Sequence, residues 1–254
     1  MNERWKEHFE HDIAFHRKTA AIYDYVNTEP RQLANDLLFA PLDRHVTGGE
    51  SMLDLGCGSG QMLLRYGARF RRAIGVDHSR EMLDLARKRV PEVTAGRCTL
   101  VESDFFAFLE AAREKFSLAT CVGCLHHVPA DAVATFFRLV RERLHDGGWL
   151  LLAEPVDIGG RTVPSPVTRW NAKSVMVARA ALMPMEESDE APVRDEMLLR
   201  QPDEYGFRQV AAARGWELFQ RAVPAGLLDQ VALRYLHARY GGSGNVIAAL
   251  WRAI

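Results

Sequence analysis

The chain has 254 residues, of which 48% are hydrophobic, so a sizeable buried core is expected and extensive disorder is not. Lysine and arginine number 32 and aspartate and glutamate 33, and this near balance argues against a dedicated nucleic-acid binder, which usually carries a basic excess. The four cysteines are too few for a disulfide scaffold, and the sequence has neither a signal-peptide pattern nor a long apolar run. These features predict a cytoplasmic protein with reduced thiols and no membrane partner.

Short apolar runs alternate with helical patterns through the middle of the chain. Continuous apolar runs are typical of parallel strands that are covered by helices on both faces. The alternation of strands and helices implies right-handed crossovers and therefore a doubly wound α/β sheet. The expected strands are residues 51–55, 73–77, 98–102, 116–122 and 149–154.

Helices are expected between these strands. A short helix over residues 61–66 follows the first strand. Ser79 stands where an N-cap would begin a helix whose apolar stripe includes Met82. Residues 131–144 carry apolar side chains at helical spacing, and residues 145–148 then have the composition of a turn.

Two segments depart from the alternation and predict a helical cap. Residues 1–47 have helical spacing before the first strand, and residues 156–199 form an insert that is interrupted by prolines. Residues 48–155 and 200–254 form the core, so residues 1–254 are expected to be a single domain with a cap. Beyond the insert we expect a helix over 202–214, a strand over 216–223, a helix over 227–239 and a strand over 245–251.

A glycine-rich loop, DLGCGSG at residues 54–60, directly follows the first strand and opens a helix. Glycine there permits a tight turn and lets a ligand approach bare backbone, and a helix N-terminus suits a carboxylate or a phosphate. Asp77 ends the second strand, where a carboxylate can accept hydrogen bonds from two ribose hydroxyls. Asp104 follows the third strand and can accept from an adenine amino group, with Phe105 beside the ring. A dinucleotide fingerprint would require glycine in place of Gln61.

Five motifs occur in order along the chain: LDLGCGSG, GVDHS, ESDF, CVGCLHHV and LHDGGWLLLAEP. In order and spacing they resemble the motifs of class I S-adenosylmethionine-dependent methyltransferases, closely over residues 50–155 and more loosely over the last two strands. The resemblance implies a Rossmann-like, seven-stranded sheet with an antiparallel last strand, and S-adenosylmethionine as the cofactor. It places the loop glycines around the methionine part of the cofactor, Asp77 at the ribose, and Asp104 with Phe105 at the adenine.

The sequence AIYD at residues 21–24 resembles an N-terminal element that lies over the cofactor in many small-molecule members of the class. The cofactor-binding residues expected from the resemblance are therefore Tyr23, Asp54, Gly56, Gly58, Gly60, Asp77, His78, Met82, Asp104, Phe105 and Cys121.

A Cys-x-x-Cys sequence at residues 121–124 raises the alternative of a zinc or redox site. A closed zinc site usually takes a second pair of ligands at a distance, and a redox pair normally opens a helix after a strand. Here Cys121 ends a buried strand, where cysteine packs as a small hydrophobic residue. No metal is therefore expected.

His126 and His127 follow the fourth strand, at the edge where ligands bind in open α/β sheets. Histidine is the side chain best matched to proton abstraction near neutral pH. Glu154 ends the fifth strand at the same edge, where a carboxylate can fix a histidine tautomer or help to take a proton. This arrangement resembles that of bacterial sugar O-methyltransferases from natural-product pathways, so all three residues are catalytic candidates. Histidines that merely pack in the loop are the alternative.

The expected reaction is in-line methyl transfer to a small-molecule acceptor at a hydroxyl oxygen, with a histidine as general base. N- or C-methylation of a small metabolite is the alternative. RNA methylation is disfavoured by the balanced charge, and the Asn/Asp-Pro-Pro-Tyr signature for planar amines is replaced by VGCL at residues 122–125. A non-catalytic cofactor-binding protein is disfavoured by the intact glycine loop. The sequence is compatible with a monomer or a homodimer and predicts no nucleic-acid partner.

Overall fold

The computed structural model describes residues 36, 38–157, 193–194, 202–214 and 246–254. The expected strand at 216–223, the expected helix at 227–239, most of the two cap segments and Tyr23 lie outside these residues.

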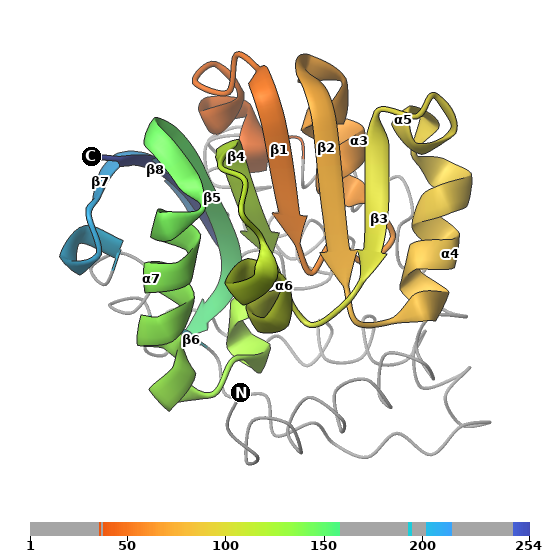
Figure 1. Ribbon diagram of the computed structural model, residues 1–254. Helices are drawn as coiled ribbons and strands as arrows, with labels where there is room; N and C mark the ends of the chain where they lie inside the picture. Colours follow the sequence, from red (N-terminus) through yellow and green to blue (C-terminus); the bar gives the residue numbers. More distant parts are fainter. Residues whose placement is uncertain (1–35, 37, 158–192, 195–201, 215–245) are drawn as a thin grey trace, which may run out of the picture.

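A single mixed sheet forms the centre of the described chain (Figure 1). The strand order is β3-β2-β1-β4-β5-β8-β7, and the short strand β6 pairs with β5. The first five strands of the sequence run parallel to one another, whereas β8 is antiparallel to both of its neighbours, as the resemblance implied. The strands are β1 (Gly49–Leu55), β2 (Phe70–Asp77), β3 (Cys98–Glu102), β4 (Phe116–Val122), β5 (Leu144–Asp157), β6 (Val193–Arg194), β7 (Phe207–Arg214) and β8 (Val246–Ala253).

Helices cover both faces of the sheet, which confirms the doubly wound architecture. In Figure 1, α6 and α7 stand in front of the sheet, α3 lies behind it and α4 lies at its right-hand side. The helices are α3 (Gln61–Tyr66), α4 (Arg80–Arg89), α5 (Pro91–Thr94), α6 (Phe105–Ala111) and α7 (Val133–Glu142), with short 3₁₀ turns η1 (Gly67–Arg69), η2 (Leu125–His127) and η3 (Ala130–Ala132).

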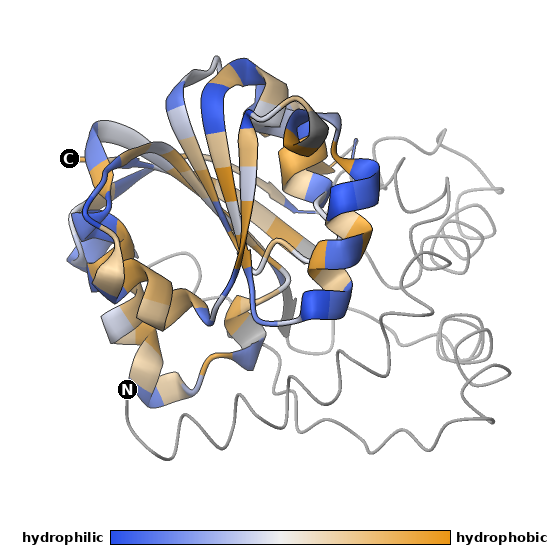
Figure 2. Cartoon of the chain, turned by 45° about the vertical axis from the view of Figure 1, so that its right-hand side comes forward, coloured by the Kyte–Doolittle hydropathy of each residue, from blue (hydrophilic) through white to orange (hydrophobic). Residues whose placement is uncertain are grey.

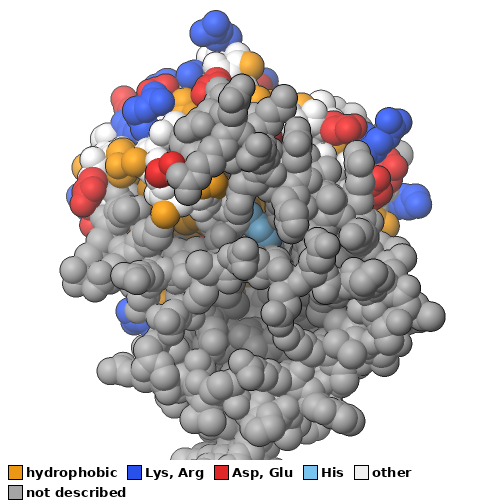
Figure 3. Space-filling model, turned by 90° about the horizontal axis from the view of Figure 1, so that it is seen from below, with side chains coloured by type: hydrophobic (Ala, Val, Ile, Leu, Met, Phe, Trp, Pro, Cys, Tyr) orange, Lys and Arg blue, Asp and Glu red, His pale blue; other side chains and the backbone are white. Residues whose placement is uncertain are grey.

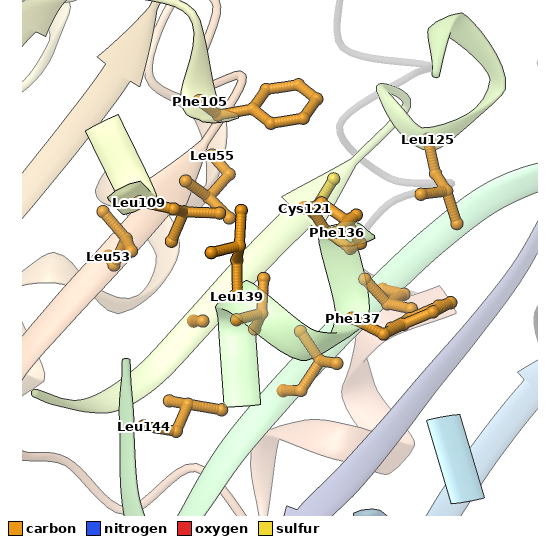
Figure 4. Packing of buried hydrophobic residues seen from close by; sticks show 14 of the residues in the cluster. Leu53, Leu55, Phe105, Leu109, Cys121, Leu125, Phe136, Phe137, Leu139 and Leu144 are labelled. Atoms are coloured by element: carbon orange, nitrogen blue, oxygen red, sulfur yellow. The ribbon is translucent and has the colours of Figure 1, made fainter. Parts of the chain in front are cut away.

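Two hydrophobic clusters, one on each face, hold the helices to the sheet. Successive residues of a strand point to opposite faces, so in β1 Met52 joins one cluster while Leu53 and Leu55 join the other. The first cluster packs against α3 and α4, and the second contains the buried aromatic rings of α6 and α7, including Phe136 (Figure 4). Figure 2 shows the result: hydrophobic strands lie inside, and hydrophilic residues lie on the outer faces of the helices.

The predicted helix boundaries follow from local signals. The Ser79 hydroxyl accepts a hydrogen bond from the Met82 backbone at 3.3 Å and caps α4, as predicted. The apolar stripe predicted over 131–144 is helical over α7, whereas Leu144 already begins β5. The turn predicted at 145–148 is an interruption within β5, because the pairing with β4 jumps from Leu144 to Trp149.

One predicted helix is wrong. The alanine-rich segment 202–214 was expected to be helical, but only residues 202–204 are, and residues 207–214 form the strand β7. Gly206, with φ +80°, stands immediately before this strand. The pairing of β7 with β8 provides a ladder of backbone hydrogen bonds that overrides the high helix propensity of alanine.

The described end of the N-terminal cap segment packs on α3, the helix that follows the glycine loop. Residues 38–43 are helical, and Leu38, Phe39 and Leu42 are buried in the same cluster as α3. Arg65 of α3 binds Asp43 through two hydrogen bonds, of 3.0 and 2.6 Å. Burial alone would raise the pKa of Asp43, but the hydrogen bonds from Arg65 and its other neighbours outweigh this and lower it. None of the described helices has the length and hydropathy needed to cross a membrane.

Candidate active site

The sheet order brings the candidate residues to one edge. β1 stands between β2 and β4, so the chain winds outward in both directions from β1, and ligands of open α/β sheets bind at such a switch point beyond the carboxyl ends of the strands. The glycine loop follows β1, Asp77 ends β2, the histidine turn follows β4, and Glu154 lies near the end of β5. This edge is at the bottom of Figure 1, and a histidine side chain is visible in the view from below (Figure 3).

The three glycines of the loop differ in why glycine is needed at their positions. All have left-handed backbones, with φ +64° at Gly56, +50° at Gly58 and +86° at Gly60. A Cβ on Gly56 would lie 2.3 Å from the Cys124 sulfur, and one on Gly60 would lie 2.5 Å from a methyl group of Val90. A Cβ on Gly58 would meet nothing within 4 Å. Gly56 and Gly60 are therefore required by packing, whereas Gly58 presents bare backbone to open space.

Asp77 fixes the position of that bare backbone. Its side chain is 9% exposed; one carboxylate oxygen accepts from the Gly58 N–H and the other from the Ser79 N–H, each at 2.8 Å. His78 is half-buried, and Met82 lies in the first turn of α4 and is 2% exposed. The carboxylate therefore joins the glycine loop to the start of α4, at the edge where it was expected to meet a ribose.

Asp54 lies in β1 directly beneath the loop and is 2% exposed. One of its carboxylate oxygens accepts from the Thr120 hydroxyl at 2.6 Å, and the other is buried with no hydrogen-bond partner among the described residues. Burial raises the pKa of Asp54 to about 7; the Thr120 hydrogen bond opposes this shift, and the nearby Asp77 carboxylate adds to it. A buried carboxylate oxygen without a partner can accept from a cationic group.

Asp104 and Phe105 have structural contacts of their own. Asp104 is the N-cap of α6, and its carboxylate accepts from the Ala107 N–H at 2.8 Å. Phe105 is 7% exposed, and its ring packs against Phe106 and Phe136 with centroid distances of 5.0 and 5.7 Å. Asp104 therefore lies at the rim after β3 as expected, while most of the Phe105 ring belongs to the core.

Cys121 belongs to the packed interior, and the half-buried Cys124 packs against the same cluster. Cys121 is fully buried among the residues of the second cluster, where Figure 4 shows it near Phe136 and Leu125. The hydrogen bond with Cys124 lowers the pKa of Cys121, but burial and the Glu154 and Asp54 carboxylates outweigh it and raise that pKa. The pKa of Cys124 is raised well above its usual value by the Cys121 contact and burial. Within the described ranges no three His, Cys, Asp or Glu side chains are grouped to hold a metal ion.

The turn η2 carries both candidate histidines. His127 is half-buried, and its backbone N–H donates to the Cys124 carbonyl at 3.1 Å. The side chain of His126 lies outside the described part of the structure. Glu154 is fully buried, and one carboxylate oxygen accepts from the Cys124 and Leu125 N–H groups at 2.8 and 2.7 Å. Glu154 therefore binds the backbone of this turn.

Sequence reasoning missed two residues of this site. Thr120 donates to Asp54, and the Cys124 thiol contacts the Gly56 carbonyl with an S–O distance of 3.3 Å. A threonine within the apolar run of β4 was the available signal for the first, because a buried hydroxyl requires a partner. The second depends on the packing of two loops that are far apart in the sequence, so nothing in the local pattern indicates it.

Comparison with known proteins agrees with this geometry. Residues 52–148 match the family model described as a methyltransferase domain. The ubiquinone biosynthesis O-methyltransferase of Actinobacillus pleuropneumoniae serotype 7 (strain AP76) is 34% identical over 107 residues, which cover 40% of this chain and 45% of that relative. The corresponding enzyme of Nitrosospira multiformis is 27% identical over 126 residues, or 49% of this chain and 52% of the relative.

Similar solved structures cover most of the chain at low identity. A DhpI–SAM–HEP complex has a TM-score of 0.62 at 16% identity, with 96% of this chain and 97% of that chain covered. The N-methyltransferase NodS of Bradyrhizobium japonicum WM9, in complex with S-adenosyl-L-homocysteine, has a TM-score of 0.57 at 12% identity, covering 92% of this chain and 96% of that one. A geranyl diphosphate C-methyltransferase of Streptomyces coelicolor A3(2) has a TM-score of 0.53 at 15% identity, with 88% and 79% covered.

The described residues form a doubly wound domain with a glycine loop at the candidate ligand edge. Residues 52–148 match the model of a methyltransferase domain, and the fold is the one found in solved S-adenosylmethionine-dependent methyltransferases, as the five motifs predicted.

Proposed function

We propose that this protein transfers a methyl group from S-adenosylmethionine to a hydroxyl oxygen of a small-molecule acceptor. The observation that carries the proposal is the meeting of three parts at one sheet edge: the bare backbone of Gly58, the Asp54 and Asp77 carboxylates, and the turn with the two histidines. Each part offers a different chemical contact, and together they match a ligand with a cationic end and a ribose.

The residues present fit the cofactor. The ammonium of its methionine part suits the buried Asp54 oxygen that has no partner among the described residues. Its ribose hydroxyls suit Asp77, whose oxygens each accept one backbone N–H and retain further lone pairs. Gly58 leaves space for close approach, and Asp104 stands at the rim where the adenine is expected. Gly56, Gly60, His78, Met82, Phe105, Cys121 and Tyr23 complete the proposed cofactor-binding set.

The bound cofactor supplies an already activated methyl group on its sulfonium, so the work of the chain is to position the two reactants. A hydroxyl acceptor must lose its proton as the new bond forms, and a histidine of the η2 turn is the proposed base. The curated relatives named as O-methyltransferases support oxygen as the acceptor atom.

We place the protein in the cytoplasm as a monomer or homodimer, with no nucleic-acid partner. Residues 1–254 form a single domain in this proposal, and residues 1–47 and 156–199 form a cap beside the ligand edge. That cap would surround the acceptor, exclude water and provide the specificity for it.

Transfer of a labelled methyl group tests the proposal. The purified protein, tritiated S-adenosylmethionine and a bacterial extract should give label in the small-molecule fraction and not in the RNA fraction. The variant in which His126 and His127 are both changed to Ala should lose about 100-fold in turnover, because a positioned base contributes on this order. Its cofactor affinity should stay nearly unchanged. Label in RNA would overturn the acceptor class, and full turnover by the double variant would overturn the base.

A further inference from the structure

The Glu154 carboxylate binds the backbone of the turn that carries the two histidines. Its side chain is fully buried, and a single carboxylate oxygen accepts from two consecutive backbone N–H groups, those of Cys124 and Leu125. Both donors belong to the start of η2, the turn that continues into His126 and His127. Distances of 2.8 and 2.7 Å are those of well-formed hydrogen bonds. The carboxylate is therefore engaged with the backbone that precedes the histidines.

The same turn is held from two further sides. The Gly123 N–H donates to the Ala153 carbonyl at 2.8 Å, so the chain before the turn is joined to β5 beside Glu154. On the opposite side, the Cys124 sulfur lies 3.3 Å from the Gly56 carbonyl, and Gly56 has no room for a Cβ against it. The turn is thus fixed between the end of β5 and the glycine loop.

We propose that Glu154 is a positioning residue, which sets the distance between the histidine turn and the glycine loop and carries no proton in the reaction. This inference rests on the proposed function, because the glycine loop is the place proposed for the methyl donor. The carboxylate acts through its accepting oxygen and through the turn. A residue that supplies the same acceptor without a carboxylate charge should therefore replace it.

Two substitutions separate positioning from proton chemistry. Glu154→Gln keeps a carbonyl oxygen where the two N–H groups point, but it removes the charge and the basicity. Glu154→Ala removes the acceptor altogether. Glu142, an exposed glutamate of α7 that is paired with Arg138, provides the matched control Glu142→Ala.

Nuclear magnetic resonance provides the first test, and it needs no acceptor. Amide exchange at Cys124 and Leu125 should remain slow in the wild type and in Glu154→Gln, and should be about tenfold or more faster in Glu154→Ala. Adding S-adenosylhomocysteine should shift the ring signals of His127 in the first two proteins, and the shift should shrink in Glu154→Ala. Glu142→Ala should behave as the wild type in both measurements.

Turnover with the acceptor found by label transfer provides the second test. Glu154→Gln should retain turnover within about threefold and leave the pH–rate profile in place, while Glu154→Ala should lose about tenfold or more with cofactor affinity unchanged. If Glu154→Ala fails to fold, Glu154→Gln alone decides. Loss of turnover in Glu154→Gln with its amides still protected would overturn the proposal, as would full turnover in Glu154→Ala with exposed amides. Absence of methyl transfer by the wild type, with the turn protected as expected, would instead refute the proposed function.

Discussion

At the scale of single residues, two buried aspartates differ in the hydrogen bonds that their carboxylate oxygens accept. Asp77 accepts backbone N–H groups with both oxygens, whereas Asp54 has one oxygen with no partner among the described residues. The sequence predicted Asp77 as a ribose contact from its place at the end of a strand, and Asp54 as a cofactor ligand from the resemblance to the methyltransferases. It could not predict the raised pKa of Asp54, because that depends on Thr120 and on the depth of burial beneath the loop.

The pH dependence of stability tests the state of Asp54. Its pKa of about 7 in the folded protein lies above the ordinary aspartate value of 3.8, so the folded state binds the proton more tightly. The free energy of unfolding should therefore fall as the pH rises between these two values, by about 2–4 kcal/mol for this group. Asp54→Asn, whose amide oxygen can still accept from Thr120, should remove that fall.

Urea unfolding of both proteins at several pH values measures this contribution. The slope of the free energy of unfolding against pH should be less negative in Asp54→Asn than in the wild type. This holds whatever the difference in absolute stability between the two proteins. Parallel slopes would show that Asp54 is already ionised at low pH in the folded protein.

The role of the bare backbone at Gly58 can be tested with Gly96 as a matched control. Gly58 and Gly96 both have positive φ, of +50° and +72°, and a Cβ on either would meet nothing within 4 Å. Alanine at either position should cost about 1 kcal/mol of stability through backbone strain. Only Gly58→Ala should also weaken binding of S-adenosylhomocysteine, by about tenfold or more, since its methyl group enters the space proposed for the cofactor. Calorimetric titration of both variants measures this difference, and equal affinities would contradict the placement of the cofactor.

At the scale of elements, the strands of the parallel half and the helices between them could be predicted from the sequence. The continuous apolar runs predicted the bounds of β3 and β4, and the Ser79 N-cap predicted the start of α4. The strand β7 could not be predicted, because Ala211, Ala212 and Ala213 favour a helix locally. Only pairing with β8, which lies more than thirty residues later in the sequence, makes the segment a strand.

The start of α6 allows capping to be separated from ligand binding. Asp104→Asn keeps an amide oxygen that can accept from Ala107, so stability should change little, because Asn and Asp are equally good N-caps. Asp104→Ala loses the cap and should be less stable by about 1 kcal/mol. If Asp104 accepts from the adenine amino group, both variants should bind S-adenosylhomocysteine more weakly. Thermal unfolding and calorimetric titration measure the two effects, and unchanged affinity in both variants would leave Asp104 with the capping role alone.

At the scale of the whole molecule, the sheet order explains why residues from five separate motifs meet. Parallel strands place their carboxyl ends at one edge, and the strand order reverses at β1, where the glycine loop and the turn after β4 lie next to each other. The sequence predicted this convergence because the motifs follow consecutive strands. The contact between Cys124 and Gly56 was beyond prediction, because it depends on how two loops pack after the sheet has formed.

Calorimetric titration of the full chain measures whether this edge binds the cofactor. We predict saturable one-to-one binding of S-adenosylhomocysteine that weakens by about tenfold or more in Asp77→Ala, because that carboxylate is the proposed ribose contact and also holds Gly58. Absence of saturable binding in the wild type, or equal affinity in Asp77→Ala, would contradict the account.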